Sequence, residues 1–297
     1  MNPSYKLQGV VLALIGTIAF AFRPVLIKLG YQTYPVSAST LLFLRMTLSL
    51  PFFAAMAWFF RKGSPISRND WLGILGLGFL GYYLASLLDF LGLQHVSAGL
   101  GRLIMFLYPT LVVILSAAFL KKPPTSREIA ALFITYAGVA LVLSTKLGGG
   151  AEQREFLIGA ALVFGSSMCY AVYLVTGSQL VQRVGSVRFT AYTMLVSTAP
   201  AIVQFFVVES PAALDLPARL WWIAIALALF CTVMPVFLVS EALRRVGANQ
   251  FALIGALGPV TTILADFVFL EGSLGAAQLV GGALVISGVL LVTIQRH

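Results

Sequence analysis

Ten apolar segments, each about as long as a bilayer is thick, limit the possible folds of this chain more than any other feature. A helix that crosses the hydrocarbon core needs roughly 20 mostly apolar residues. Inside lipid every backbone N–H and C=O must be paired within the protein, which restricts spanning structures to helices and closed barrels. The predicted segments are 7–29, 37–60, 70–93, 97–120, 127–145, 157–181, 189–208, 220–243, 248–270 and 275–294. We therefore predict an all-α integral membrane protein with ten transmembrane helices.

The composition agrees with this prediction and narrows the possible partners. Of the 297 residues, 60% are hydrophobic and 10% are charged, and the segments between the apolar stretches are too short to form a soluble domain. A net charge of +9 would suggest nucleic acid in a soluble protein, but in a membrane protein it indicates cytoplasmic loops. We expect the lipid bilayer and a small-molecule substrate as partners, and no nucleic acid. The oligomeric state stays open, and a monomer is compatible with the sequence.

An internal repeat relates the two halves of the chain. Residues 96–120 and 246–270 align without a gap at an offset of 150, with Pro109 opposite Pro259. We expect a first five-helix repeat over 1–147, a linker over 148–155 and a second repeat over 156–297. Because each repeat has five spans, the second enters the membrane from the opposite face and the topology is inverted. Paired apolar segments interrupted by Gly or Pro are a sequence sign of a transporter's binding site.

The distribution of Lys and Arg predicts the orientation. If the spans alternate in direction, twelve basic residues lie on one side of the membrane and three on the other. Basic loops face the cytoplasm, so both termini are predicted to be cytoplasmic, with Gly148–Gly150 outside. The start of the chain also resembles a signal peptide that ends at Ala19-Phe20-Ala21. Its cleavage would leave nine spans and destroy the symmetry of the repeats, so we favour a first transmembrane helix.

Charged residues also fall inside the predicted spans, away from their first residues: Arg23, Lys28, Arg45, Asp89, Arg102, Glu241 and Asp266. Buried charges in a bilayer usually face a cavity or a partner. We expect Asp89 and Arg102, at similar depth on consecutive helices, to form a gate pair near the outer side, with a static ion pair as the alternative. Snorkelling is the preferred interpretation for Lys28. Glu241 is expected to pair with Arg244 and Arg245, its neighbours along the helix.

Polar and aromatic side chains recur at helical spacing on several segments. Such faces suit an amphiphilic small molecule, although ordinary helix packing also produces them. The prolines of the repeat are predicted hinges, because proline interrupts the helix hydrogen bonds. The candidate substrate-binding residues are Phe20, Arg23, Phe79, Tyr82, Ser86, Arg102, Phe106, Tyr170, Tyr173, Met234, Phe237 and Gln250. The candidate gate and hinge residues are Asp89, Arg102, Pro109 and Pro259.

No catalytic signature is found in the sequence. It lacks the phosphate-binding loop of nucleotide hydrolases, the HExxH zinc motif and the GxSxG elbow. Cys169 and Cys231 lie inside apolar runs and are expected to behave as small hydrophobic residues. We therefore predict no enzyme, no catalytic residue, no cofactor and no metal site.

The arrangement resembles the drug/metabolite transporter superfamily, in particular its EamA-type ten-helix members. The resemblance is carried by the two five-helix halves, the Pro109 and Pro259 helices, and the closing segments 134–143 and 284–292. The segment 119–128 is similar to the family's link between helices 4 and 5, except that Lys121 stands where an acidic residue is usual. Among the branches, the chain looks most like the YddG-type amino-acid exporters.

That resemblance implies a central cavity lined by helices 1, 3, 4, 6, 8 and 9, alternating access, and a place in a bacterial inner membrane. We therefore expect a secondary transporter that exports amino acids, aromatic ones among them, and related small amphiphilic metabolites. A carrier of organic cations or of anionic metabolites with the same fold is the alternative. An intramembrane enzyme acting on lipid-linked substrates is a third class, and it would need a set of reactive groups that the sequence does not offer.

Overall fold

The computed structural model describes residues 3–62, 65–121, 123–144, 151–270 and 275–293, and the regular structure in these ranges is entirely helical. The elements are α1 (Pro3–Ala21), α2 (Arg23–Thr33), α3 (Ala38–Phe59), α4 (Arg68–Leu77), η1 (Gly78–Leu84), α5 (Ala85–His95), α6 (Ala98–Met105), α7 (Tyr108–Leu120), α8 (Ser126–Ser144), α9 (Ala151–Val184), α10 (Ser186–Val208), η2 (Pro211–Leu214), α11 (Ala218–Ala228), η3 (Leu229–Val233), α12 (Met234–Gly255), α13 (Leu257–Leu270) and α14 (Ala276–Thr293).

The ten expected apolar segments are present as helices. Within the described ranges, eight helical stretches are long and apolar enough to cross a membrane, and two shorter apolar helices, Leu257–Leu270 and Ala276–Leu291, complete the set. Several stretches consist of two or three consecutive elements, such as α1 with α2 and α4 with η1 and α5. The all-α membrane fold predicted from the sequence is therefore confirmed.

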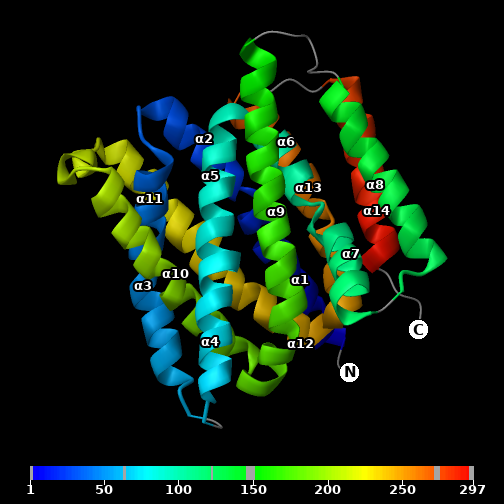
Figure 1. Cartoon of the computed structure of the whole chain (residues 1–297), viewed down its shortest axis with the longest axis horizontal. Helices are drawn as coiled ribbons and strands as arrows, with labels where there is room; N and C mark the ends of the chain where they lie inside the picture. The colour runs from blue at the N-terminus through cyan, green and yellow to red at the C-terminus, as the bar shows by residue number, and fades with distance from the viewer. Residues whose placement is uncertain (1–2, 63–64, 122, 145–150, 271–274, 294–297) are drawn as a thin grey trace.

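The helices pair across the two halves of the chain in a symmetric pattern. The largest contacts join α8 to α14, α1 to α12, α5 to α9, and α3 to α10, and α6 packs on α13. Exchanging the first half with the second converts the α1–α12 pair into the α5–α9 pair and leaves the α8–α14 and α3–α10 pairs unchanged. Figure 1 shows α8 and α14 side by side at one edge, and both chain ends at the same end of the molecule. This pairing is what an inverted repeat requires.

The prolines of the repeat stand just after helix breaks. α6 ends at Met105 and α7 begins at Tyr108, while α12 ends at Gly255 and α13 begins at Leu257. In an unbroken helix residue 109 would donate to the carbonyl of Met105, but a proline has no N–H. The hydroxyl of Ser167 on α9 donates to that carbonyl instead, at 3.0 Å. The predicted kinks at Pro109 and Pro259 are thus present, while their role as moving hinges stays a prediction.

Two π-helical turns occupy corresponding places in the two halves. η1 covers Gly78–Leu84 in the third span, and η3 covers Leu229–Val233 in the eighth. At the offset of 150 these segments overlap. A π-turn inserts an extra residue into the helix and rotates the residues that follow it, and such turns are frequent at functional sites. Neither turn was expected from the apolar pattern.

The boundary between the halves differs from the prediction in one respect. The part of the expected linker at Gly148–Gly150 lies outside the described residues, whereas residues 151–155 already form the first turn of α9. Glu152 lies in that turn, where a carboxylate favours helix formation through the helix dipole. In the second half, helix α12 contains a break at Gly247, whose φ of 77° suits glycine.

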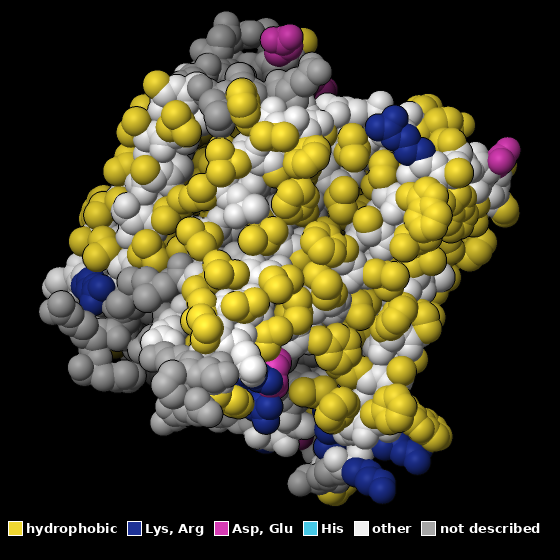
Figure 2. Space-filling view, turned by 180° about the vertical axis from the view of Figure 1, so that it is seen from behind, with side chains coloured by type: hydrophobic (Ala, Val, Ile, Leu, Met, Phe, Trp, Pro, Cys, Tyr) yellow, Lys and Arg dark blue, Asp and Glu magenta, His cyan; other side chains and the backbone are white. Residues whose placement is uncertain are grey.

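The surface agrees with a membrane location. Figure 2 shows a face covered mainly by hydrophobic side chains, and most of its Lys and Arg lie toward the end that carries both termini. Large apolar side chains are exposed along the spans, among them Phe133, Val207 and Phe119, which are 74%, 77% and 72% accessible. Exposed apolar surface on this scale is normal only where lipid replaces water.

The predicted orientation can be tested with two exposed positions at opposite ends of the molecule. In a variant with Cys169 and Cys231 replaced by Ser, Glu152→Cys should react with a membrane-impermeant thiol reagent in intact cells. Asn69→Cys should react only after the membrane is opened, because the basic loops face the cytoplasm. The reverse pattern would contradict cytoplasmic termini, and reaction of both in intact cells would contradict the span count.

Candidate functional site

A buried ion pair joins the first and third spans. The Nη2 atom of Arg23 lies 2.9 Å from Oδ2 of Asp89, and the Asp89 side chain is only 5% exposed. Arg23 is the first residue of α2, directly after the break between α1 and α2 at Phe22, where Pro24 interrupts the helix. That break directs the start of α2 toward α5. We expected Asp89 to pair with Arg102, but in this structure its partner is Arg23, which stands directly after the break.

Arg45 is the most deeply buried cation of the group. It is 3% exposed, and its Nη2 atom donates to Ser86 Oγ at 2.8 Å. Its guanidinium lies 5.3 Å from the centre of the Phe90 ring, within the range of a cation–π contact. Its Nε is buried and has no hydrogen-bond partner in the described part of the chain. Arg45 is therefore solvated by a hydroxyl and a ring, and no carboxylate bonds to it among the described residues.

Arg102 has the least complete set of partners. Over the described part of the chain, no hydrogen bond or ion pair reaches its guanidinium, and its Nε is buried and unpaired. The residue keeps intermediate exposure, and it lies within electrostatic range of Arg23, Asp89, Tyr108 and Tyr170. A guanidinium offers five N–H donors in a planar fork that matches a carboxylate. Arg102 can therefore donate hydrogen bonds to an acceptor that the described side chains do not supply.

Four tyrosines form a continuous aromatic cluster beside Arg102. The ring of Tyr108 on α7 meets Tyr170 on α9 edge-on at 5.1 Å, and Tyr170 stacks on Tyr173 at 5.9 Å. Tyr173 in turn meets Tyr82 of η1 edge-on at 5.1 Å, and their hydroxyls are 3.5 Å apart. Tyr82, Tyr108 and Tyr170 retain intermediate exposure. Tyrosine combines an apolar ring with a polar tip, so this cluster can contact both parts of an amphiphilic molecule.

Gly81 makes room for the cluster. A Cβ atom at this position would lie 2.5 Å from the ring of Tyr173, which is closer than side-chain packing permits. The hydroxyl of Ser166 on α9 donates to the carbonyl of Ala85 at 2.6 Å, next to the π-turn. These two contacts hold η1 and α9 together and fix the positions of Tyr82 and Tyr173.

The predicted site residues divide into those near the cluster and those away from it. Arg23, Tyr82, Ser86, Asp89, Arg102, Tyr170 and Tyr173 belong to one connected set of ion pairs, hydrogen bonds, ring contacts and electrostatic neighbours. Phe106 is buried and meets Tyr108 edge-on at 6.1 Å. Phe20, Met234 and Gln250 are half-buried, and the Oε1 of Gln250 has no hydrogen-bond partner among the described residues. Phe79 and Phe237 are 47% and 45% exposed.

The helical spacing that placed Phe79 beside Tyr82, Ser86 and Asp89 does not describe this span. Between Gly78 and Leu84 the chain is π-helical, and Phe79 packs against Tyr83, with ring centres 5.2 Å apart. Tyr83 bonds to Gln204 on α10, on a different side from the Tyr82–Tyr173 contact. The wider turn has separated the two faces, because an α-helical period of 3.6 residues does not hold across a π-turn.

Tyr108 and Arg45 are members of the site that we did not name as substrate-binding residues. Tyr108 directly precedes Pro109, and residues beside a repeated kink are natural candidates for a binding site. Arg45 was visible as an intramembrane charge, which is a functional hypothesis by default. The contacts that place these residues together come from different spans, and spacing within one helix does not reveal them.

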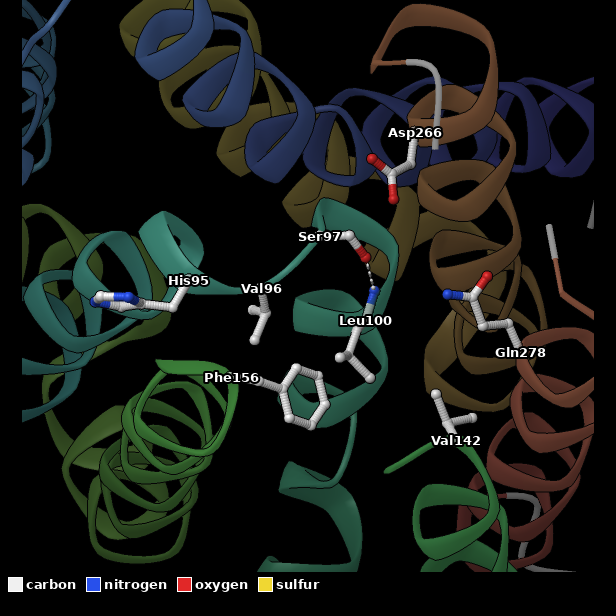
Figure 3. A pocket seen from close by; sticks show the side chains of 8 residues that line it. All are labelled: His95, Val96, Ser97, Leu100, Val142, Phe156, Asp266 and Gln278. Atoms are coloured by element: carbon white, nitrogen blue, oxygen red, sulfur yellow. Dashed lines mark hydrogen bonds between the residues drawn. The ribbon is translucent and has the colours of Figure 1, made fainter. Parts of the chain in front are cut away.

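A separate pocket lies at the end of the molecule away from the termini. Its volume is about 170 Å³, and its lining is His95, Val96, Ser97, Leu100, Val142, Phe156, Asp266 and Gln278. Figure 3 shows these side chains converging from α5, α6, α8, α9, α13 and α14. Asp266 Oδ2 accepts from the N–H of Gly99 at 2.9 Å, and His95 pairs with Glu155 at 2.7 Å. Asp266 thus ties the second half of the chain to the start of α6.

Comparison with known proteins identifies the family. The EamA-like transporter family matches twice, over residues 7–144 and 157–294. The chain belongs to the EamA-like transporter family. The double match agrees with the two repeats inferred from the sequence and from the helix pairing. It also makes this chain a multi-pass membrane transporter, which confirms the family resemblance.

The individual relatives are less specific about the substrate. The uncharacterized transporter YcbK of Bacillus subtilis is 32% identical over 281 residues, covering 92% of this chain and 88% of the relative. The threonine/homoserine exporter RhtA of Salmonella typhimurium is 27% identical over 230 residues, covering 75% and 70%. The chain also matches a known crystal structure with 19% sequence identity and a TM-score of 0.65, and the match covers 99% of this chain and 97% of the chain in that structure. A match at this identity supports the fold alone.

Tyr82 offers a direct test of the tyrosine cluster. Tyr82→Ala removes a ring that meets Tyr173, and we expect transport to fall while the melting temperature changes little, because Tyr82 is only partly buried. Tyr82→Phe keeps the ring and should keep most of the transport. Proteoliposome efflux and thermal unfolding in detergent measure the two effects. Normal transport by Tyr82→Ala would assign Tyr82 to packing alone.

The Arg23–Asp89 pair can be tested with a double-mutant cycle. Asp89→Asn or Arg23→Gln alone leaves a charge without its partner in a low-dielectric interior, at a cost of about 3 kcal/mol. The double variant removes both charges and should unfold at a higher temperature than either single variant. Unfolding measurements on the four proteins give the interaction energy. Purely additive effects would show that the pair contributes nothing.

Proposed function

We propose that this chain exports amino acids and related small carboxylates through a central site formed by the tyrosine cluster and Arg102. The main support is the state of Arg102, a partly exposed residue whose Nε is buried, with two tyrosines within electrostatic range and no acceptor among the described residues. A carboxylate would complete its hydrogen bonds bidentately. The tyrosine rings would pack on the apolar part of the same molecule.

The relatives favour export as the direction. RhtA, which aligns over three quarters of this chain, is named as a threonine/homoserine exporter. Threonine and homoserine both carry an α-carboxylate, the group that Arg102 suits. The aromatic part of our expectation, that aromatic amino acids are among the substrates, has its support in the four tyrosines.

Alternating access would use the symmetric breaks as hinges. α6 and α7 are separated at Pro109, and α12 and α13 at Pro259, so the two parts of each span are able to tilt separately. The site residues Arg102 and Tyr108 lie on opposite sides of the first break. Rocking around this break would change the side of the membrane to which the site is open. With the orientation proposed above, substrate enters from the cytoplasm and leaves on the outer side.

An organic-cation carrier is the main rival within the fold. Such a carrier needs an available carboxylate in its site. Here Asp89 is bonded to Arg23, and Asp266 is bonded to the backbone of Gly99. Both acids are therefore occupied by donors in this structure, which favours carboxylates over cations.

Efflux from proteoliposomes loaded with labelled compounds tests the proposal. The panel contains threonine, phenylalanine, glutamate, a diamine such as putrescine, and a sugar phosphate. We expect amino-acid efflux well above that of empty liposomes, and its loss in Arg102→Gln. Arg61→Gln, which removes an exposed arginine at a helix end, is the matched control and should transport normally. Efflux of putrescine without any amino acid would favour the rival.

A further inference from the structure

We propose that the transported molecule carries a net negative charge, so that acidic amino acids and small dicarboxylates are preferred over their uncharged amide counterparts. This inference rests on the proposed function and adds the charge of the substrate to it. The observation behind it is a charge imbalance in the interior of the helix bundle. RhtA is named for two amino acids without net charge, so the inference rests on the charges of this chain and not on that relative.

The interior cluster contains three guanidinium groups and one carboxylate. Arg23, Arg45 and Arg102 all lie within electrostatic range of Asp89, and among the described residues Asp89 forms an ion pair with Arg23 alone. Two positive charges therefore have no acidic partner in the part of the chain that the structure describes. Burying a charge without a counter-ion in a bilayer costs several kcal/mol.

The other acids of the spans are committed elsewhere. Glu241 forms ion pairs with Arg244 at 2.7 Å and Arg245 at 2.6 Å, as the sequence predicted. Asp266 accepts from Gly99 and has Lys28 as its electrostatic neighbour. Neither acid contributes to the balance around Arg45 and Arg102. The missing negative charge is therefore expected from a bound molecule.

The backbone of α13 approaches Arg102 closely. Gly258, at the start of α13, lies against the guanidinium: a Cβ atom there would be 3.2 Å from Nη2. At the repeat offset, Gly258 corresponds to Tyr108 in the first half. The second half thus has a hydrogen atom where the first half has a ring, and this difference lets the backbone of α13 lie against the guanidinium.

The charge balance distinguishes acids from neutral amino acids. A zwitterionic amino acid brings one carboxylate and one ammonium, so it leaves both excess positive charges in place. Its ammonium would also need Asp89, which Arg23 already occupies. A second carboxylate gives the ligand a net charge of about −1 and reduces the imbalance. The field of Arg45 contributes to this preference without direct contact, because charges interact over long range in low dielectric.

The test uses two pairs of molecules that differ by one charge and hardly in shape: glutamate with glutamine, and aspartate with asparagine. Proteoliposomes are loaded with each labelled compound in turn, and the initial efflux rate and the half-saturating concentration are measured. For each compound we take the ratio of the efflux rate to the half-saturating concentration. We expect this ratio to be about tenfold higher for the acid than for its amide, a difference equivalent to one charge–charge contact of modest strength.

Variants assign the preference to the cluster. Arg102→Gln should remove the acid preference, while Arg102→Lys keeps the charge and should keep part of it. Gly258→Ala, which crowds the guanidinium, should weaken it. Arg61→Gln removes a charge outside the cluster and should leave the preference unchanged. Melting temperatures of all variants, measured in detergent, show whether each is folded.

The outcomes separate this inference from the proposed function. If glutamine and asparagine leave the liposomes as fast as the acids or faster, the substrate is an amino acid and the charge inference is wrong. If threonine or phenylalanine leaves faster than from protein-free liposomes and none of the four compounds does, the charge inference is wrong. If no amino acid leaves faster than from protein-free liposomes, the proposed function itself is wrong. An acid preference that survives Arg102→Gln in a folded protein would also overturn the assignment to this cluster.

Discussion

The placement of charged side chains inside an apolar bundle is the constraint on which the rest of this structure depends. Arg23, Arg45, Arg102 and Asp89 lie together in the interior of a protein that is 60% hydrophobic. In lipid such groups are tolerated only when other groups of the protein, water or a ligand solvate them. The break at Phe22 brings Arg23 to Asp89, and the end of the π-turn places Ser86 against Arg45. The irregular parts of the helices are therefore the parts that accommodate charge.

The backbone is symmetric between the halves, whereas the chemistry is not. Helix breaks at Pro109 and Pro259 and π-turns in the third and eighth spans repeat at the same offset. The charged residues do not repeat: Ala252 corresponds to Arg102, and Val239 corresponds to Asp89. A symmetric scaffold provides two equivalent arrangements for alternating access. An asymmetric set of side chains gives that scaffold one site with a defined charge.

Much of the fold follows from the sequence, because bilayer length and backbone pairing leave few alternatives. The ten segments, the two repeats and the breaks beside Pro109 and Pro259 were all predictable from apolar runs and matched prolines. The π-turn at Gly78–Leu84 was not, since no residue in that segment distinguishes it from an α-helical glycine-containing segment. That π-turn explains why Phe79 and Tyr82 lie on different faces of the third span.

The partners within the site were less predictable. The sequence indicated which residues carry charge, but Asp89 had two arginines within reach and the kink at Pro24 decided between them. The contacts of Tyr108 with Tyr170 depend on how α7 meets α9. Such contacts between spans are set by helix packing, which periodicity along one helix does not encode.

A structure determined with bound glutamate would test the central claim most directly. We predict that one carboxylate of the ligand lies about 2.7–3.0 Å from a terminal nitrogen of Arg102, with the ligand stem against the tyrosine cluster and the Arg23–Asp89 pair intact. A ligand whose ammonium group bonds to Asp89, with Arg102 left without an acceptor, would contradict it.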